Sequence, residues 1–112
     1  MTTPDMTEAT VRVATSEGRV RIVLEGEIDL ANARRVGREI TAAITNRTTA
    51  TVVDLSGVTY LDSAGLHVLF DLAARLPTLQ IALELIAPLG SQVRRVMEIC
   101  GLTTVATVLP ES

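Results

Sequence analysis

A change of hydrophobic period along the chain is the feature that most constrains its fold. Up to about residue 28, apolar and polar residues alternate with a period of two, which is typical of half-buried strands. Beyond that point, segments with apolar residues three or four positions apart alternate with short β-branched segments, which indicates helices between buried strands. The order β-β-α-β-α-β-α-β predicts an α/β fold: a mixed, mainly parallel sheet, joined by right-handed crossovers, with about three main helices packed on it.

The first two strands are expected to form an antiparallel hairpin around a Ser16-Glu17-Gly18 turn. Its half-buried pattern comes from Val11, Val13, Val20, Ile22 and Leu24. Residues 26–29 should then lead into a helix, for which Asp29 is a plausible N-cap. The apolar stripe expected on that helix consists of Leu30, Ala33, Val36, Ile40 and Ile44.

The central strand and the helix after it are expected between residues 51 and 77. Residues 51–55 are short, β-branched and apolar, as a strand covered on both faces should be, and the strand is expected to end at Ser56-Gly57. A loop over residues 55–63 then positions Asp62 as the N-cap of a helix that Pro77 ends. The apolar stripe of that helix consists of Leu66, Leu69, Phe70, Ala73 and Leu76.

The last third of the chain is expected to contain a strand over residues 79–86, a helix over residues 88–100 and a short strand over residues 105–109. Gly101 is placed as the C′ residue of the helix. Cys100 and the methionines are interpreted as packing residues. Because no repeat or linker interrupts the pattern, residues 11–112 are predicted to form one domain after an N-terminal tail, residues 1–10.

Composition and charge argue against several classes of function. A net charge of −3 argues against nucleic-acid binding, which depends on clustered cations, and one Phe, one Tyr and no Trp provide no stacking platform for bases. The single Cys100 and the single His67 have no partner at metal-ligand spacing, so neither a metal nor another cofactor is expected. Without a signal peptide or a long apolar run, the chain is expected to be cytoplasmic, away from membranes, and to bind another protein.

Open α/β sheets place their functional sites beyond the carboxyl ends of the parallel strands, which selects residues 26–29 and 55–63. Ser63 would lie at the first helical position beside Asp62, where a kinase could reach it. A phosphate there would lie near unpaired helix N–H groups, so it need not destabilise the fold. A partner fitted to the neutral hydroxyl would instead meet a dianion, and its affinity should fall by at least about a hundredfold.

Two other interpretations of this pair remain open from the residues alone. An Asp-Ser pair is more commonly a simple helix cap. A hydrolase triad of Ser63, His67 and an Asp is disfavoured, because a nucleophile elbow needs Gly at the position of Leu61, and a base four residues along the same helix is poorly aimed. The sequence also lacks a Gly-rich Lys loop for nucleotide phosphates, so no enzymatic activity is expected.

Three segments resemble the motifs of a known family. Residues 52–66, Val-Val-Asp-Leu-Ser-Gly-Val-Thr-Tyr-Leu-Asp-Ser-Ala-Gly-Leu, closely resemble the signature of the STAS-domain anti-sigma factor antagonists. Residues 26–29 resemble a second family element, and residues 93–102 are similar to the family's last helix with its Gly-Leu end. The three matches occur in the right order, which makes the resemblance specific.

The resemblance implies partner switching in a bacterial stress response. In the unmodified form such a protein captures an anti-sigma factor, itself an ATP-dependent serine kinase, and so frees a sigma factor for transcription. The resemblance makes Ser63 the phosphoacceptor, which a separate serine phosphatase would reset. Asp29 and Asp62 match acidic motif positions that help to present Ser63, and Ala64 and Gly65 complete the expected partner-binding segment.

Some functional questions stay open at this level. One alternative is a STAS subunit that never cycles phosphate, either a scaffold of a stress complex or an accessory subunit of a lipid-transport ATPase. Ala64 stands where family members often have a second hydroxyl residue, which removes an alternative acceptor. Asp54 is either a strand-end hydrogen-bond partner or a direct participant, and His67 is interpreted as a surface residue.

Overall fold

The chain folds into a five-stranded mixed sheet whose strands lie side by side in sequence order, in a computed structural model that describes residues 8–111. β1 is antiparallel to β2, and the other neighbouring strands are parallel. The predicted fold class is therefore confirmed. The strands are β1 (Ala9–Ser16), β2 (Arg19–Ile28), β3 (Ala50–Leu61), β4 (Ala82–Ile86) and β5 (Thr107–Leu109). The helices are α1 (Ala33–Ala43), α2 (Ser63–Arg75), the 3-10 helix η1 (Pro77–Leu79), α3 (Gln92–Cys100) and α4 (Leu102–Val105).

The hairpin between β1 and β2 forms as the turn residues dictate. Glu17 and Gly18 both have positive φ, of 52° and 82°, which is the left-handed backbone that tight hairpin turns require. Ser16 pairs with Arg19, and the antiparallel ladder continues to Ala9. Because β1 begins at Ala9, two residues of the expected N-terminal tail belong to the sheet, while residues 1–7 of that tail lie outside the described part of the chain.

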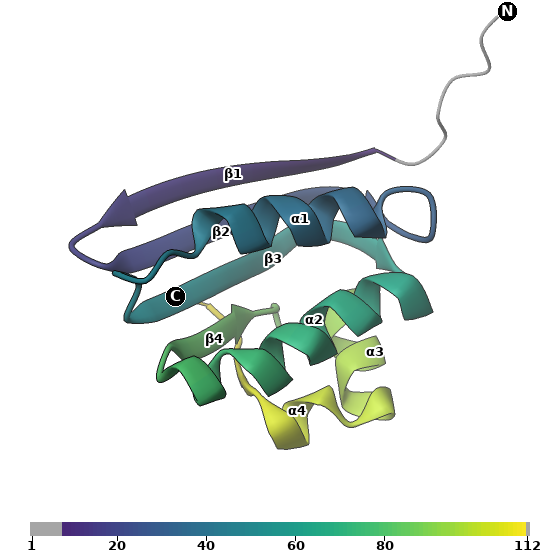
Figure 1. The fold of residues 1–112 in the computed structure, drawn as a ribbon. Coiled ribbons are helices and arrows are strands. Elements are labelled where there is room, and N and C mark those ends of the chain that lie inside the picture. The colour runs from purple at the N-terminus through teal and green to yellow at the C-terminus, as the bar shows by residue number, and fades with distance from the viewer. Residues whose placement is uncertain (1–7, 112) are drawn as a thin grey trace, which may run out of the picture.

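One hydrophobic core lies between the sheet and the helices. α1 and α2 cover the same face of the sheet (Figure 1), and the predicted stripes point into it, with Val36, Ile40 and Leu69 at most 1% exposed. Full burial of one such side chain stabilises the fold by roughly 1.5–3 kcal/mol. Further core residues come from β2, β3, β4, α2, α3 and α4: Val20, Ile22, Leu24, Val53, Leu55, Leu72, Leu85, Val93, Met97 and Leu102. The interpretation of Cys100 as a packing residue is wrong, because this last residue of α3 is exposed.

Several predicted boundaries differ from the observed ones for local reasons. The strand expected to start at residue 79 begins at Ala82, because η1 and a left-handed Gln80 (φ 60°) precede it. The third helix begins at Gln92 rather than Pro88, because the Ser91 side chain accepts a hydrogen bond from the Arg94 amide as N-cap. Gly101 ends α3 with a positive φ of 86°, as predicted.

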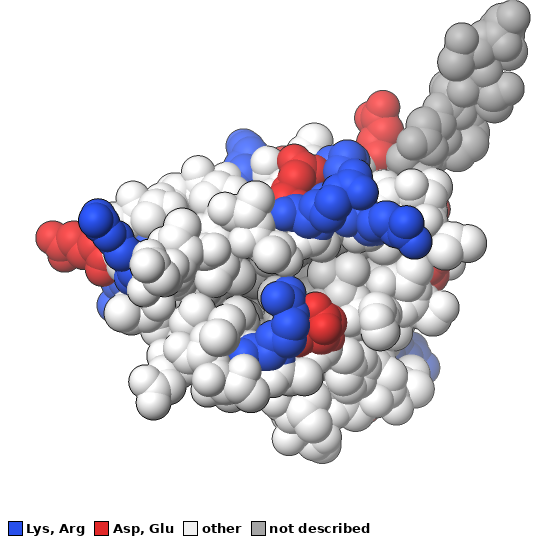
Figure 2. Space-filling model, in the orientation of Figure 1, with Lys and Arg blue, Asp and Glu red and all other residues white. Residues whose placement is uncertain are grey.

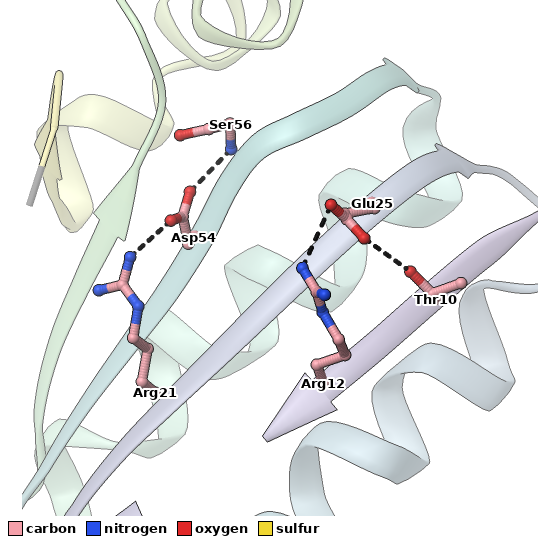
Figure 3. A network of polar contacts seen from close by, with 6 residues as sticks. All are labelled: Thr10, Arg12, Arg21, Glu25, Asp54 and Ser56. Atoms are coloured by element: carbon pink, nitrogen blue, oxygen red, sulfur yellow. Dashed lines mark hydrogen bonds and ion pairs between the residues drawn. The ribbon is translucent and has the colours of Figure 1, made fainter. Parts of the chain in front are cut away.

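The central strand β3 is not covered on both faces. The face that points away from α1 and α2 holds a polar network (Figure 3), in which Arg21 donates to Asp54 at 2.6 Å and the Ser56 amide donates to Asp54 at 2.9 Å. On the same face, Glu25 pairs with Arg12 at 3.3 Å. These contacts hold neighbouring strands in register.

The carboxylate of Asp54 has a lowered pKa. Partial burial opposes its ionisation, but hydrogen bonds from Ser56 and the charge of Arg21 outweigh that effect. Asp54 lies well before the end of β3 at Leu61, on the open face of the sheet. Its geometry is therefore that of a structural hydrogen-bond partner in the sheet.

Thr51 provides a first test of the core. Its hydroxyl is buried without a hydrogen-bond partner among the described residues, and the residue is 1% exposed. Because an unsatisfied buried hydroxyl costs about 1–3 kcal/mol, we expect Thr51→Val to raise the free energy of unfolding by about 1 kcal/mol. Urea denaturation measures this; Thr15→Val, at an exposed position of β1, is the matched control and should change little. A lower stability for Thr51→Val would show that its hydroxyl has a favourable partner.

Over residues 8–111, none of the helices has the length and hydropathy that crossing a membrane requires. In the same range, the His, Cys, Asp and Glu side chains do not gather in threes that could hold a metal ion.

Candidate functional site

The site is built where β2 and β3 end together. The last residues that pair are Ile28 and Leu61, and the Asp62 amide then donates to the Ile28 carbonyl at 3.2 Å. The two segments expected to be loops, residues 26–29 and 55–63, are therefore mostly strand. Pairing continues because the strands accommodate register irregularities after Val23 and after Gly26. As a result, Asp29 and Asp62 leave the sheet at the same level.

Asp62 joins the two segments. Its Oδ1 atom accepts hydrogen bonds from the amides of Ala64, at 2.9 Å, and Gly65, at 3.1 Å, which confirms it as the N-cap of α2. Its Oδ2 atom accepts from the amide of Leu30, at 3.1 Å, in the connection between β2 and α1. Two helix amides that we expected to be unpaired near a phosphate are thus already bonded to Asp62, so that expectation is wrong for Ala64 and Gly65.

Asp29 is not the N-cap of the first helix. α1 begins at Ala33, and the preceding residues form a turn in which the Asp29 carboxylate accepts from the Ala31 amide at 2.9 Å. The Asp29 carbonyl accepts from the Ala33 amide at 2.7 Å. Asp29 therefore caps a turn before the helix, by the same local hydrogen bonding that makes Asp favourable at N-caps.

The turn is held from inside by Asn32. This side chain accepts from the Asp29 amide at 3.0 Å and donates to the Glu27 carbonyl at 2.8 Å, and the residue is only 5% exposed. Leu30, expected on the buried stripe of the helix, instead projects from the turn and is 84% exposed. The helical spacing of Leu30 was therefore misleading, because the residue precedes α1.

Ser63 is the first residue of α2 and is exposed. Its side chain makes no hydrogen bond to the described residues, so a modification there would break none. Ala64 is half-buried, while Gly65 is buried against the end of the sheet. A Cβ atom at Gly65 would lie 2.5 Å from the Leu61 side chain and 3.1 Å from the Ile28 carbonyl oxygen, so glycine lets α2 start close to the sheet.

Exposed apolar side chains lie near the carboxyl ends of three parallel strands. Leu30, Tyr60 and Leu89 are 84%, 43% and 71% exposed and lie at or just beyond the carboxyl ends of β2, β3 and β4. β2 and β3 end side by side, with Ile28 paired to Leu61, whereas β4 ends at Ile86 opposite Asp54, seven residues before β3 ends. Leu30 and Tyr60 therefore share this edge, and Leu89 lies apart from it. Grouped exposed apolar residues mark protein-interaction surfaces. Sequence reasoning missed all three; the Pro-Leu-Gly turn at Leu89 was the one local signal for an exposed position.

His67 lies one turn after Ser63 on α2 and is exposed, as predicted. It makes no hydrogen bond to the described residues, and it lines a groove between α1 and α2. Ser63, His67 and a carboxylate therefore do not form a hydrogen-bonded triad in the described part of the chain.

Comparison with known proteins places the chain in a family. The family model described as Mlab, STAS domain, matches residues 11–110. An anti-sigma-F factor antagonist of Mycobacterium tuberculosis, RsfB, is 33% identical over 102 residues, which cover 91% of this chain and 80% of RsfB. The chain belongs to the STAS-domain anti-sigma factor antagonist family. The resemblance found in residues 52–66 is therefore confirmed.

Solved structures agree with this assignment of the STAS domain. The crystal structure of an anti-sigma factor antagonist from Mycobacterium paratuberculosis matches with a TM-score of 0.82 and 27% identity, over 98% of this chain and 91% of that one. The phosphorylated form of SpoIIAA from Bacillus matches with a TM-score of 0.65 and 20% identity, over 88% and 90%. This second likeness concerns the fold alone. RsfB and the Mycobacterium paratuberculosis protein are both named as anti-sigma factor antagonists.

Proposed function

We propose that this STAS domain is an anti-sigma factor antagonist of the bacterial cytoplasm. Its unmodified form binds an anti-sigma factor that is also an ATP-dependent serine kinase, and this binding releases a sigma factor. Phosphorylation of Ser63 ends the binding, and a serine phosphatase restores it. The observation that carries the proposal is the exposed Ser63 hydroxyl, which makes no hydrogen bond to the described residues, at an edge where Leu30 and Tyr60 are also exposed.

The apolar side chains supply the affinity in this account. Leu30 and Tyr60 project where β2 and β3 end side by side, so a partner can cover them together. Covering a Leu side chain completely is worth roughly 1.5–3 kcal/mol, so a few such residues suffice for a regulated complex. Leu30 is held in place by the hydrogen bond from its amide to Asp62, which links this surface to the modification site.

The charge of a phosphate supplies the switch. A phosphoserine at position 63 adds about −1.5 to −2 charges next to the Asp62 carboxylate. The amides of Ala64 and Gly65 already donate to Asp62, so they do not compensate the added charge unless Asp62 moves. A docked partner would have to desolvate both charges, which costs several kcal/mol. The fold itself loses no hydrogen bond, because the Ser63 side chain makes none to the described residues.

Phosphorylation by the partner is the step to test first. We expect incubation with ATP and the purified anti-sigma factor kinase to add one phosphate, which mass spectrometry should locate on Ser63. Ser63→Ala should remain unmodified, whereas Ser56→Ala, which removes another exposed hydroxyl on β3, should still be phosphorylated. A chain that binds its partner but never gains phosphate would instead be a non-cycling STAS subunit, such as a scaffold or an accessory subunit of a lipid-transport ATPase.

A further inference from the structure

A groove runs between α1 and α2, next to the site at Ser63. Its volume is about 1060 Å³, and small or apolar side chains such as Ala33, Val68 and Leu72 line it. Ala64 and His67, which lie close to Ser63 on α2, also line the groove, so it opens toward the modification site. A docked partner at Ser63 would therefore have direct access to it.

The groove is cationic although the chain is acidic. Its charged lining residues are Arg34, Arg38, Arg75 and Asp71, in a chain whose net charge is −3. Figure 2 shows the arginine side chains gathered over α1 and an arginine beside a carboxylate on α2, with uncharged surface between them. The cations therefore line an apolar hollow rather than a generally basic surface.

The two arginines of α1 are available to a ligand. Arg75 pairs with Asp71 at 2.8 Å and donates to Thr41 of α1 at 3.2 Å, which bridges the two helices at the end of the groove remote from Ser63. Arg34 and Arg38, in contrast, are exposed and make no ion pair or hydrogen bond with the described residues. They are four residues apart on one helix face, where side chains are neighbours.

We propose that this groove receives an amphipathic helix of the anti-sigma factor, with apolar residues against Leu30 and Val68 and carboxylates against Arg34 and Arg38. This inference rests on the proposed function and names a second part of the same interface. Carboxylates at positions i and i+4 of a helix have the same spacing as the two arginines. The exposed lining residues Ala31 and Ala42 have small side chains, which lets a helix backbone approach.

Charge reversal on α1 tests the groove. We expect Arg34→Glu with Arg38→Glu to weaken binding of the purified anti-sigma factor kinase by about tenfold or more, because attraction becomes repulsion at two adjacent positions. The matched control is Arg19→Glu with Arg47→Glu, which makes the same charge change at the opposite end of the parallel strands and should alter affinity by less than about threefold. Titration calorimetry measures both, after circular dichroism has shown that both variants are folded.

The outcomes separate this proposal from the proposed function. Ser63→Asp should abolish the residual binding of the charge-reversed variant, because the phosphate switch acts independently of the groove. Equal affinity of the groove variant and the unmodified protein would overturn the groove and leave the proposed function intact. If the control variant loses as much affinity for the kinase as the groove variant, the effect comes from net charge and the groove proposal is overturned. If the free chain forms a dimer that the groove variant no longer forms, the occupant of the groove is a second copy of this chain, which also overturns the proposal. Failure of the unmodified chain to bind the kinase would overturn the proposed function and the groove with it.

Discussion

Ser63→Asp is expected to bind the anti-sigma factor kinase at least about a hundredfold more weakly than the unmodified protein, while Ser63→Ala should bind with nearly unchanged affinity. The reason is the position of the hydroxyl, exposed at the start of α2 and next to the Asp62 carboxylate. A carboxylate at position 63 would place a second negative charge in the interface. The two amides nearest to it already donate to Asp62.

Asn has the same shape as Asp but no charge, so Ser63→Asn separates the effect of charge on binding from the effect of side-chain size. Ser63→Asn matches Asp in volume without its charge, so it should bind far more tightly than Ser63→Asp. Calorimetric titration of the kinase into each variant gives the affinities, and thermal melting should show that all three remain folded. If Asn and Asp weaken binding equally, steric exclusion rather than charge operates the switch.

Gly65→Ala is expected to lower the free energy of unfolding by about 1–3 kcal/mol, the usual cost of adding a group to a filled space. The new Cβ atom would lie 2.5 Å from Leu61 and 3.1 Å from the backbone oxygen of Ile28. Leu61 is only 6% exposed and a backbone oxygen cannot rotate away, so α2 must shift outward. Because Ser63 lies on the first turn of α2, the shift should also weaken partner binding.

Gly37→Ala, in the middle of α1, is the matched control for this substitution. Its Cβ atom would lie 3.7 Å from the nearest atom of Val68, which is ordinary contact, so the change should stabilise the fold by about 0.5–1 kcal/mol through helix propensity alone. Urea denaturation of both variants measures the difference. A Gly65→Ala protein as stable as the unmodified one would mean that α2 does not need its close approach to the sheet.

The sequence predicted the helices and their buried faces well, because burial follows helical period directly. Val36, Ile40 and Leu69 are all buried as their spacing indicated. The same rule failed at Leu30, which has helical spacing from Ala33 but belongs to the preceding turn. Hydrophobic periodicity cannot predict this turn, because the hydrogen bonds of the buried Asn32 side chain stabilise it.

The far end of β3 was not predictable from local pattern. Residues 56–61 contain Gly57 and polar residues that resemble a loop, yet they continue to pair with β2 through irregular register. A Cβ atom at Gly57 would lie 2.8 Å from the Glu25 side chain, so the close strand pairing there depends on a residue distant in sequence. The Asp62 cap and the position of Ser63 were predictable, whereas the exposed positions of Leu30 and Tyr60 depend on how the ends of β2 and β3 meet.

The most direct test of the account compares one preparation of the protein before and after complete phosphorylation at Ser63. Its melting temperature and its affinity for the anti-sigma factor kinase are measured on the same samples. We predict that the melting temperatures of the two forms differ by only a few degrees, while phosphorylation raises the dissociation constant at least about a hundredfold. An unchanged dissociation constant, or a loss of binding that occurs only because the modified protein unfolds, would contradict the central claim.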